Sequence, residues 1–341
     1  MKTDILDLTS DQMRSGIISM GEPPHRAAQI FRWLWRKNVR DFTEMTDIPK
    51  DLAAKLAKKF FAGEIELADR LRSKDGTEKF LWRLEDGFFV ESVLIKEGKR
   101  RTACLSTQVG CRFRCPFCAS GQGGFKRDLK MSEIADQIAE VQKITGCRVT
   151  NVVFMGMGEP LDNYDNLVRA LEVINSPSGL GIGARKITVS TCGIVPGILK
   201  LKDLPLQAEL SVSLHGATDR VRNSLVPAGK KYPLEKLIKA CERYYEDTGR
   251  VITLEYTLIK GRNDLVFDAE ELAKVAKRLK AKVNLIACNA FPGSGLQPAS
   301  SGATELFRKI LRSNRVTVTV RKSKGEDILA ACGQLAARRR G

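Results

Sequence analysis

The chain has 341 residues, 43% of them hydrophobic and 28% charged, which is the composition of an ordinary globular protein large enough to bury a sizeable core. No apolar run approaches the roughly 18 residues that would span a bilayer. The first residues, MKTDILDLTSDQ, are acidic where a secretory signal is basic and then apolar. We therefore expect a cytoplasmic protein without a membrane partner, in which nine cysteines serve metal binding or catalysis and not disulfides.

The net charge of +17 indicates a polyanionic partner. Residues 96–130 hold nine basic side chains and two acidic ones, so the charge is concentrated in one stretch. This stretch is either a solvated basic loop or a phosphate-binding rim, and its position around a cysteine cluster favours the rim. A second basic run, Arg338 to Arg340, is weaker evidence, because such tails are often merely solvated.

Residues 1–62 are predicted to form a small helical unit, because apolar residues recur at helical intervals. Phe31, Trp33 and Trp35 alternate with basic residues. These aromatic rings could stack on unpaired bases, but core packing is the favoured interpretation.

From about residue 64 the pattern alternates between strands and helices. The predicted strands are 102–107, 150–155, 186–190, 208–214, 251–258 and 283–287, with a last β-like run at 316–320. The predicted helices between them include 132–144, 233–245 and 269–279. Six parallel strands with crossover helices predict an α/β protein with a partial (β/α)6 barrel of the TIM type. The predicted domains are 1–62, 63–325 (the barrel with a preceding β-rich segment) and 326–341 (a C-terminal extension).

Cys111, Cys115 and Cys118 form a C-x3-C-x2-C cluster directly after the first predicted barrel strand. In such barrels the active site lies at the C-terminal ends of the strands. Three thiolates without a nearby fourth suit a metal centre that keeps one coordination position open, such as a [4Fe–4S] cluster. The spacing would also fit one face of a helix, but Pro116 and the surrounding glycines favour a loop.

Polar residues follow several other predicted strands. The segments are GMGEP with Gly158 and Glu159, STCG with Ser190, SLHG with Ser213, Leu214 and His215, and Asn289 followed by FPGSG. Each alone could be a plain turn. Together they predict a polar ring around one barrel mouth, which a single amphipathic cofactor could bridge.

The cysteine loop followed by GEP, STCG, SLHG and an asparagine at the last strand resembles the radical S-adenosylmethionine (SAM) enzymes. Within them, the chain is similar to the RlmN branch of the RNA adenine methyltransferases, relatives of the Cfr enzymes. The similarity extends over nearly the whole chain, from GEPPHRAAQIFRWLWRKNVRDFTEMTDIPKDL through CLSTQVGCRFRCPFCASGQGGF and GMGEPLDNYDNL to GEDILAACGQL.

This resemblance implies a role for each matching residue. Cys111, Cys115 and Cys118 would bind a [4Fe–4S] cluster. The residues that would hold SAM are Gly158, Glu159, Ser190, Ser213, Leu214, His215 and Asn289. Cys332 would carry the methyl group, Cys104 would be the second catalytic cysteine, and Glu91 would be the proton acceptor.

The resemblance also implies a reaction: methylation of carbon 2 of adenine in 23S ribosomal RNA near the peptidyl transferase centre, and in transfer RNA next to the anticodon. Transfer would pass through an S-methylcysteine, a 5′-deoxyadenosyl radical and a transient disulfide, with an external flavodoxin-like electron donor and a monomeric enzyme. The alternatives are a Cfr-like reaction at carbon 8 and a non-catalytic RNA-binding protein with a structural zinc.

Overall fold

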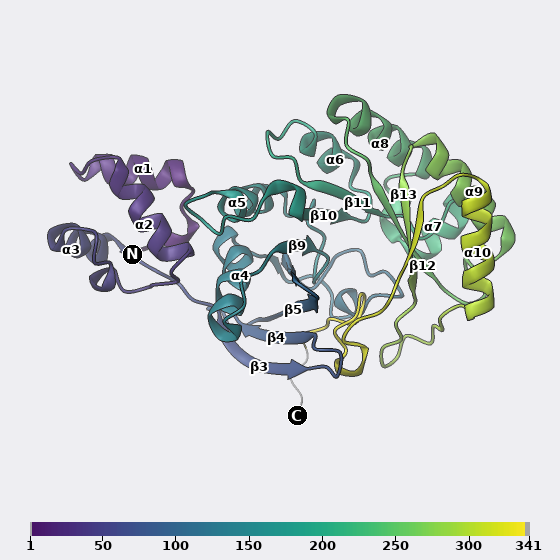
Figure 1. Cartoon of the computed structure of the whole chain (residues 1–341), viewed down its shortest axis with the longest axis horizontal. Helices are drawn as coiled ribbons and strands as arrows, with labels where there is room; N and C mark the ends of the chain where they lie inside the picture. Colours follow the sequence, from purple (N-terminus) through teal and green to yellow (C-terminus); the bar gives the residue numbers. More distant parts are fainter. Residues whose placement is uncertain (1, 338–341) are drawn as a thin grey trace.

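The structure is a computed structural model that describes residues 2–337. In this part of the chain a ten-stranded mixed sheet carries helices along its outer side, and a helical unit from the N-terminal region lies at one end (Figure 1). The predicted basic run Arg338 to Arg340 lies outside the described residues. No helix of the described part is both long and apolar enough to cross a membrane.

The N-terminal unit consists of helices and one short parallel strand pair. Its elements are β1 (Thr3–Asp4), α1 (Ser10–Ser19), α2 (His25–Trp35), α3 (Lys50–Lys59) and β2 (Phe60–Phe61). A capping box begins α1, because the Thr9 hydroxyl accepts from the Gln12 N–H and the Gln12 side chain accepts from the Thr9 N–H. Phe31, Trp33 and Trp35 are all buried, which confirms the core-packing interpretation.

Seven parallel strands form the larger part of the main sheet. In spatial order they are β14 (Val318–Arg321), β13 (Lys282–Ala287), β12 (Thr253–Leu258), β11 (Glu209–Ser213), β10 (Ile187–Thr191), β9 (Asn151–Phe154) and β6 (Arg100–Cys104). The six predicted barrel strands are all present in the predicted order, and β14 continues the parallel sheet by one strand. An antiparallel meander then extends the sheet beyond β6. Its strands are β5 (Phe89–Glu97), β4 (Glu78–Arg83) and β3 (Glu66–Arg72).

The helices cover the outer side of the sheet (Figure 1). They are α4 (Met131–Thr145), α5 (Tyr164–Asn175), α6 (Val195–Leu201), α7 (Asp219–Leu225), α8 (Leu234–Thr248), α9 (Val266–Arg278) and α10 (Ser301–Ser313). Short 3-10 turns are Ile5–Asp7, Phe42–Glu44, Ala119–Gly121, Ala184–Lys186, Pro227–Lys230 and Glu326–Ile328. The predicted helices correspond to α4, α8 and α9, with ends that differ by a few residues.

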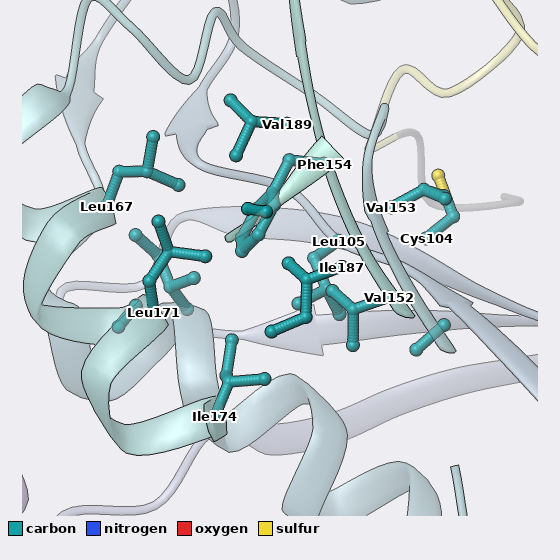
Figure 2. Close-up of a cluster of buried hydrophobic side chains, with 14 of the residues drawn as sticks. Cys104, Leu105, Val152, Val153, Phe154, Leu167, Leu171, Ile174, Ile187 and Val189 are labelled. Carbon is teal, nitrogen blue, oxygen red and sulfur yellow. The ribbon is translucent and has the colours of Figure 1, made fainter. Parts of the chain in front are cut away.

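Alternation along the strands separates the outer core from the barrel interior. Figure 2 shows the outer side, where side chains of α5 such as Leu171 point toward Phe154 and Ile187 of the sheet. Cys104 lies apart from this group and pairs in register with Val153. One face of each strand therefore builds the core, and the opposite face is left for the barrel interior.

The N-terminal unit is fastened to the barrel through α4. Arg40 pairs with Asp136, and the Asn38 side chain donates to Glu140 at 2.6 Å. The other carboxylate oxygen of Asp136 accepts from the Ile65 N–H. Burial raises the pKa of Asp136 to about 7, although Arg40 acts in the opposite direction. The unit is thus joined by buried polar contacts and does not hang on a free linker.

Beyond β14 the chain returns across the sheet to the β3–β4 hairpin. The Ser73 hydroxyl donates to Asp327 at 2.6 Å, and the Gly325 N–H donates to Asp75 at 3.0 Å. The Lys79 ammonium reaches the Leu329 carbonyl at 3.2 Å. These contacts bring the last described residues back beside the first strands of the barrel.

Candidate active site

A cavity lies at the C-terminal ends of the parallel strands, as the barrel architecture predicts. Most of the predicted site residues line it: Cys111, Cys115, Cys118, Gly158, Glu159, Ser190, Ser213, His215, Asn289 and Cys332. Leu214 does not, because its side chain belongs to the core and only its backbone stands at the strand end. The cavity joins residues from five strand ends, the cysteine loop and the C-terminal segment.

The cysteine loop is a true loop, closed at its base by the strand pair β7 (Gln108–Val109) and β8 (Arg127–Asp128). Gly110 has φ +76°, and a Cβ there would stand 1.7 Å from the Gly124 carbonyl oxygen. Only glycine permits this backbone crossing. The helix-face alternative for the cysteine spacing is therefore wrong.

Burial is the main influence on the pKa values of the three loop thiols. It raises the pKa of Cys111 to about 12, and it raises the pKa values of Cys115 and Cys118, with neighbouring thiols adding to the shift at Cys115. These cysteines hold their protons unless a metal centre displaces them. Soft thiolates in a dry cavity fit an iron–sulfur cluster.

Among residues 2–337, no group of three His, Cys, Asp or Glu side chains is arranged to hold a single metal ion.

Glu159 ties two strand ends together. Its carboxylate accepts from the Cys192 N–H at 2.7 Å and from the Leu161 N–H at 3.1 Å. The preceding Gly158 has φ +96°, and a Cβ there would meet the Gln108 side chain at 2.5 Å. The GMGEP segment is thus more than a plain turn, since it holds a buried carboxylate at the cavity wall.

His215 is a neutral hydrogen-bond donor at this wall. Its backbone is left-handed, with φ +54°, and its Nδ1 accepts from the Thr257 N–H at 2.9 Å. The remaining proton is therefore on Nε2. Burial, assisted by the positive charge of Arg222, lowers the pKa of His215 to about 3. The imidazole therefore stays uncharged over the physiological range.

Cys104 and Cys332 meet in a second cavity, which shares Met155, Ile286, Asn289 and Cys332 itself with the first. Asn289 donates to the Cys332 carbonyl at 3.1 Å. Burial raises the pKa of Cys104 to about 12, and the neighbouring Cys332 adds to this shift. The structure has no disulfide between them, and the two cysteines face a common space.

Two charged residues of the barrel interior were missed in the sequence. Arg321 of β14 lies beside Cys332 and Cys104, whose charges raise its pKa. Glu255 of β12 accepts from Ser211 and Asn284 through one oxygen, while its other oxygen has no partner among the described residues. Strand alternation could have found Glu255, which occupies an inward position of the predicted strand 251–258, whereas Arg321 lies one residue beyond the predicted run 316–320.

Glu91 lies outside the linings of both cavities. The residue is buried, with 3% of its surface exposed. One carboxylate oxygen is 3.0 Å from the Lys79 ammonium, and the other accepts from the N–H groups of Ala336 and Ala337 at 2.8 and 3.1 Å. In this arrangement Glu91 anchors the C-terminal segment that carries Cys332.

The basic stretch 96–130 is partly neutralised. Four of its cations pair with acids: Lys96, Arg112, Arg127 and Lys130. Among the described residues, four exposed cations of the stretch have no acidic partner: Lys99, Arg100, Arg114 and Lys126. These remain free to meet phosphates.

The fold and the cysteine-lined cavity have clear counterparts among known proteins. Residues 105–279 match the radical SAM superfamily. A crystal structure of a radical SAM methyltransferase from Sphaerobacter thermophilus has a TM-score of 0.93 and 41% sequence identity, covering 98% of this chain and 100% of that one. The chain is a member of the radical SAM superfamily, and the predicted α/β fold class is confirmed.

Comparison over the full length narrows the assignment. Residues 3–61 match the ribosomal RNA large subunit methyltransferase N-terminal domain. Proteins named "Probable dual-specificity RNA methyltransferase RlmN" are 44% identical in Thermoanaerobacter sp. (strain X514), over 97% of both chains, and 46% identical in Akkermansia muciniphila, over 97% of this chain and 94% of that one. The chain belongs to the RlmN family. This confirms the predicted enzyme class and leaves the non-catalytic zinc alternative without support.

Proposed function

We propose that this enzyme methylates carbon 2 of adenine in RNA, in 23S ribosomal RNA and in transfer RNA next to the anticodon, as a monomer served by an external flavodoxin-like electron donor. The names of its relatives support an RNA substrate. The observation that carries the reaction type is the joined pair of cavities, one lined by the three-cysteine loop and the other shared by Cys104 and Cys332.

The first cavity would hold the cofactors. Cys111, Cys115 and Cys118 would bind a [4Fe–4S] cluster, which supplies the electron that cleaves SAM and so starts the radical chemistry. The strand ends would bind SAM through one donor, the His215 Nε2–H, and one acceptor, the Glu159 carboxylate, both of which the site already orients. Supporting positions are Gly158, Ser190, Ser213, Leu214 (through its backbone) and Asn289.

The second cavity would carry the methyl group to the base. The Cys332 thiolate would attack the methyl carbon of one SAM molecule and displace S-adenosylhomocysteine, which leaves an S-methylcysteine. A 5′-deoxyadenosyl radical from a second SAM molecule would take a hydrogen atom from this S-methyl group, and the remaining methylene carbon would bond to the base. The Cys104 thiolate would then attack the Cys332 sulfur and break its bond to that carbon. As the Cys104–Cys332 disulfide forms, the released carbon would take up a proton to become the methyl group, and one electron would return to the cluster. An external reductant returns both residues to thiols.

Glu91 would accept the ring proton in the last step. Both of its oxygens are engaged with Lys79 and with the backbone of Ala336 and Ala337. The C-terminal segment must therefore move before Glu91 can act as a base.

The RNA must present its adenine outside the base stack, because the two cysteines are enclosed by the barrel. The N-terminal unit and the exposed cations around the cysteine loop would hold the phosphates on either side of the flipped nucleotide.

The decisive experiment is anaerobic reconstitution with iron and sulfide, followed by turnover on transcribed fragments of 23S ribosomal RNA and on transfer RNA. Mass spectrometry of the digested RNA should find 2-methyladenosine. Detection of 8-methyladenosine alone would show that the enzyme catalyses the Cfr-like reaction at carbon 8. The absence of any methylated adenine would contradict the proposal.

Variants separate the two cysteine roles. We expect Cys332→Ala to carry no S-methyl group and Cys104→Ala to accumulate protein cross-linked to RNA. Cys147→Ala is a matched control, because Cys147 lies outside both cavities. Normal turnover by Cys104→Ala would show that Cys104 is not needed to release the RNA from Cys332.

A further inference from the structure

Arg222, on α7, is a fully buried arginine behind the cofactor cavity, with a relative exposure of 0%. Its guanidinium donates to the Ser213 carbonyl at 3.0 Å, to the Leu214 carbonyl at 2.7 Å and to the Cys192 carbonyl at 2.5 Å. These carbonyls stand at the ends of β11 and β10. One side chain thus clamps the two strand ends that carry SLHG and STCG.

The glycines of STCG and SLHG both leave room for Arg222. A Cβ at Gly193 would stand 2.7 Å from the Arg222 Nη2 atom, and a Cβ at Gly216 would stand 2.5 Å from the Arg222 backbone nitrogen. A Cβ does not approach other atoms this closely, so a larger residue would displace the guanidinium at Gly193 or the backbone of α7 at Gly216.

The charge of Arg222 is not balanced by the protein. Among the described residues no carboxylate lies within ion-pair distance of the guanidinium, and its Nε–H has no acceptor. The charge of Asp219, the first residue of α7, acts on Arg222, but its carboxylate forms no ion pair with the guanidinium and accepts from the Leu234 N–H. A buried cation without a counter-charge is costly, so the site is incomplete without an anion.

The surroundings indicate where that anion belongs. Ser213 and Cys192, whose carbonyls accept from the guanidinium, line the cofactor cavity together with the three cysteines of the loop. With three thiolates, an oxidised [4Fe–4S] cluster would have a net charge of roughly −1, and one-electron reduction would make it roughly −2. A fixed cation nearby therefore stabilises the reduced cluster more than the oxidised one.

We propose that Arg222 is the buried counter-cation of the three-cysteine centre and raises its reduction potential while clamping the ends of β10 and β11. This inference rests on the proposed cluster. Arg222 is a positioning residue, because it acts through the cavity wall and through its charge and does not touch the reacting atoms.

The test is an anaerobic redox titration of the reconstituted full-length protein, monitored by electron paramagnetic resonance without SAM. We expect Arg222→Met and Arg222→Gln to lower the equilibrium constant for cluster reduction by about tenfold or more, which is a fall of about 59 mV in midpoint potential for one electron. Arg222→Lys keeps the charge and should retain most of the wild-type potential, even if the strand ends are less well held.

Arg40→Met is the matched control. It removes a partly buried cation that has its own carboxylate partners, Asp136 and Glu140, away from the cofactor cavity, and it should leave the potential unchanged. Two neutral variants, Arg222→Met and Arg222→Gln, are used in case one of them fails to fold. Circular dichroism shows which variants are folded, and iron content shows which contain the cluster.

A neutral variant that folds and holds a cluster at the wild-type potential would overturn the counter-cation role and leave only the structural clamp. If the wild-type protein itself takes up no cluster, the proposed function fails first and the inference falls with it. Equal losses of potential in the Lys, Met and Gln variants would likewise count against a role of charge.

Discussion

His215 is buried in the barrel wall, which holds its imidazole neutral. Its Nδ1 accepts from the Thr257 N–H, and the positive charge of Arg222 adds to the effect of burial in lowering its pKa. Glu159 is likewise buried, and burial raises the pKa of its carboxyl. Because neighbouring charges are not screened here, each residue of the site depends on the charges around it.

This environment makes folding stability depend on pH through His215. Its pKa is about 6.5 in the unfolded chain and about 3 in the fold. The stabilisation is therefore complete above pH 6.5 and is lost progressively as the pH falls toward 3. At pH 5.5 the linkage amounts to about 1.4 kcal/mol.

His215→Asn removes this titration and retains a residue that accepts a left-handed backbone. We expect the difference in unfolding free energy between pH 8 and pH 5.5 to shrink by about 1.4 kcal/mol relative to the parent protein. Anaerobic urea denaturation at the two pH values measures it. His25→Asn, which changes a residue outside the cavity, should leave the difference unaltered. An unchanged pH dependence in His215→Asn would mean that the imidazole is not held neutral.

At the scale of elements, the segment that carries Cys332 is held by the cysteine loop, which lies far from it in the sequence. The Ser120 hydroxyl donates to the Leu335 carbonyl at 2.7 Å, and the Ala119 N–H donates to the Gly333 carbonyl at 2.7 Å. Gly333 has φ +83°, and a Cβ there would stand 2.7 Å from the Phe117 carbonyl oxygen. The segment is therefore docked directly on the cysteine loop, so that the two chemical centres are positioned against each other.

Glu91→Gln tests the anchor of this segment. Glutamine loses the attraction of Lys79 and accepts more weakly from the Ala336 and Ala337 amides. Because hydrogen bonds to charged groups contribute about 1.5–3 kcal/mol, we expect these two amides to exchange hydrogen about tenfold faster. Hydrogen exchange with mass spectrometry over 329–337 measures the effect. Glu97→Gln is a control on the same strand, because Glu97 is exposed and pairs at 3.8 Å with Lys324. Unchanged exchange would show that Glu91 is not an anchor.

At the scale of the whole molecule, local patterns in the sequence predicted the framework of the site, and long-range contacts decided its details. Strand periodicity predicted the parallel sheet, and the position of Cys111 directly after a strand predicted its place at the barrel mouth. The clamp by Arg222 could not be predicted, because it joins a helix to two strand ends through bonds that no sequence period signals. The contacts of Glu91 could not be predicted for the same reason. Its partners are Lys79 on the neighbouring strand and the amides of Ala336 and Ala337, which are 245 and 246 residues away in the sequence. The roles of the individual site residues remain predictions.

The distribution of charge over the molecule predicts how it binds RNA. Arg114 and Lys126, on the cysteine loop, are exposed and without an acidic partner among the described residues. Each phosphate contact on a single strand contributes about 0.7 to the slope of log K against log salt concentration. We therefore expect the double variant R114A/K126A to bind RNA more weakly at low salt and to reduce this slope by about 1.4. Filter binding of transfer RNA across a range of potassium chloride concentrations measures both. The matched double variant K274A/R278A removes two cations that already pair with glutamates on the outer helices, so its slope should stay at the wild-type value. Equal losses in the two variants would show that the overall charge of the protein, and not the rim of the cysteine loop, holds the RNA.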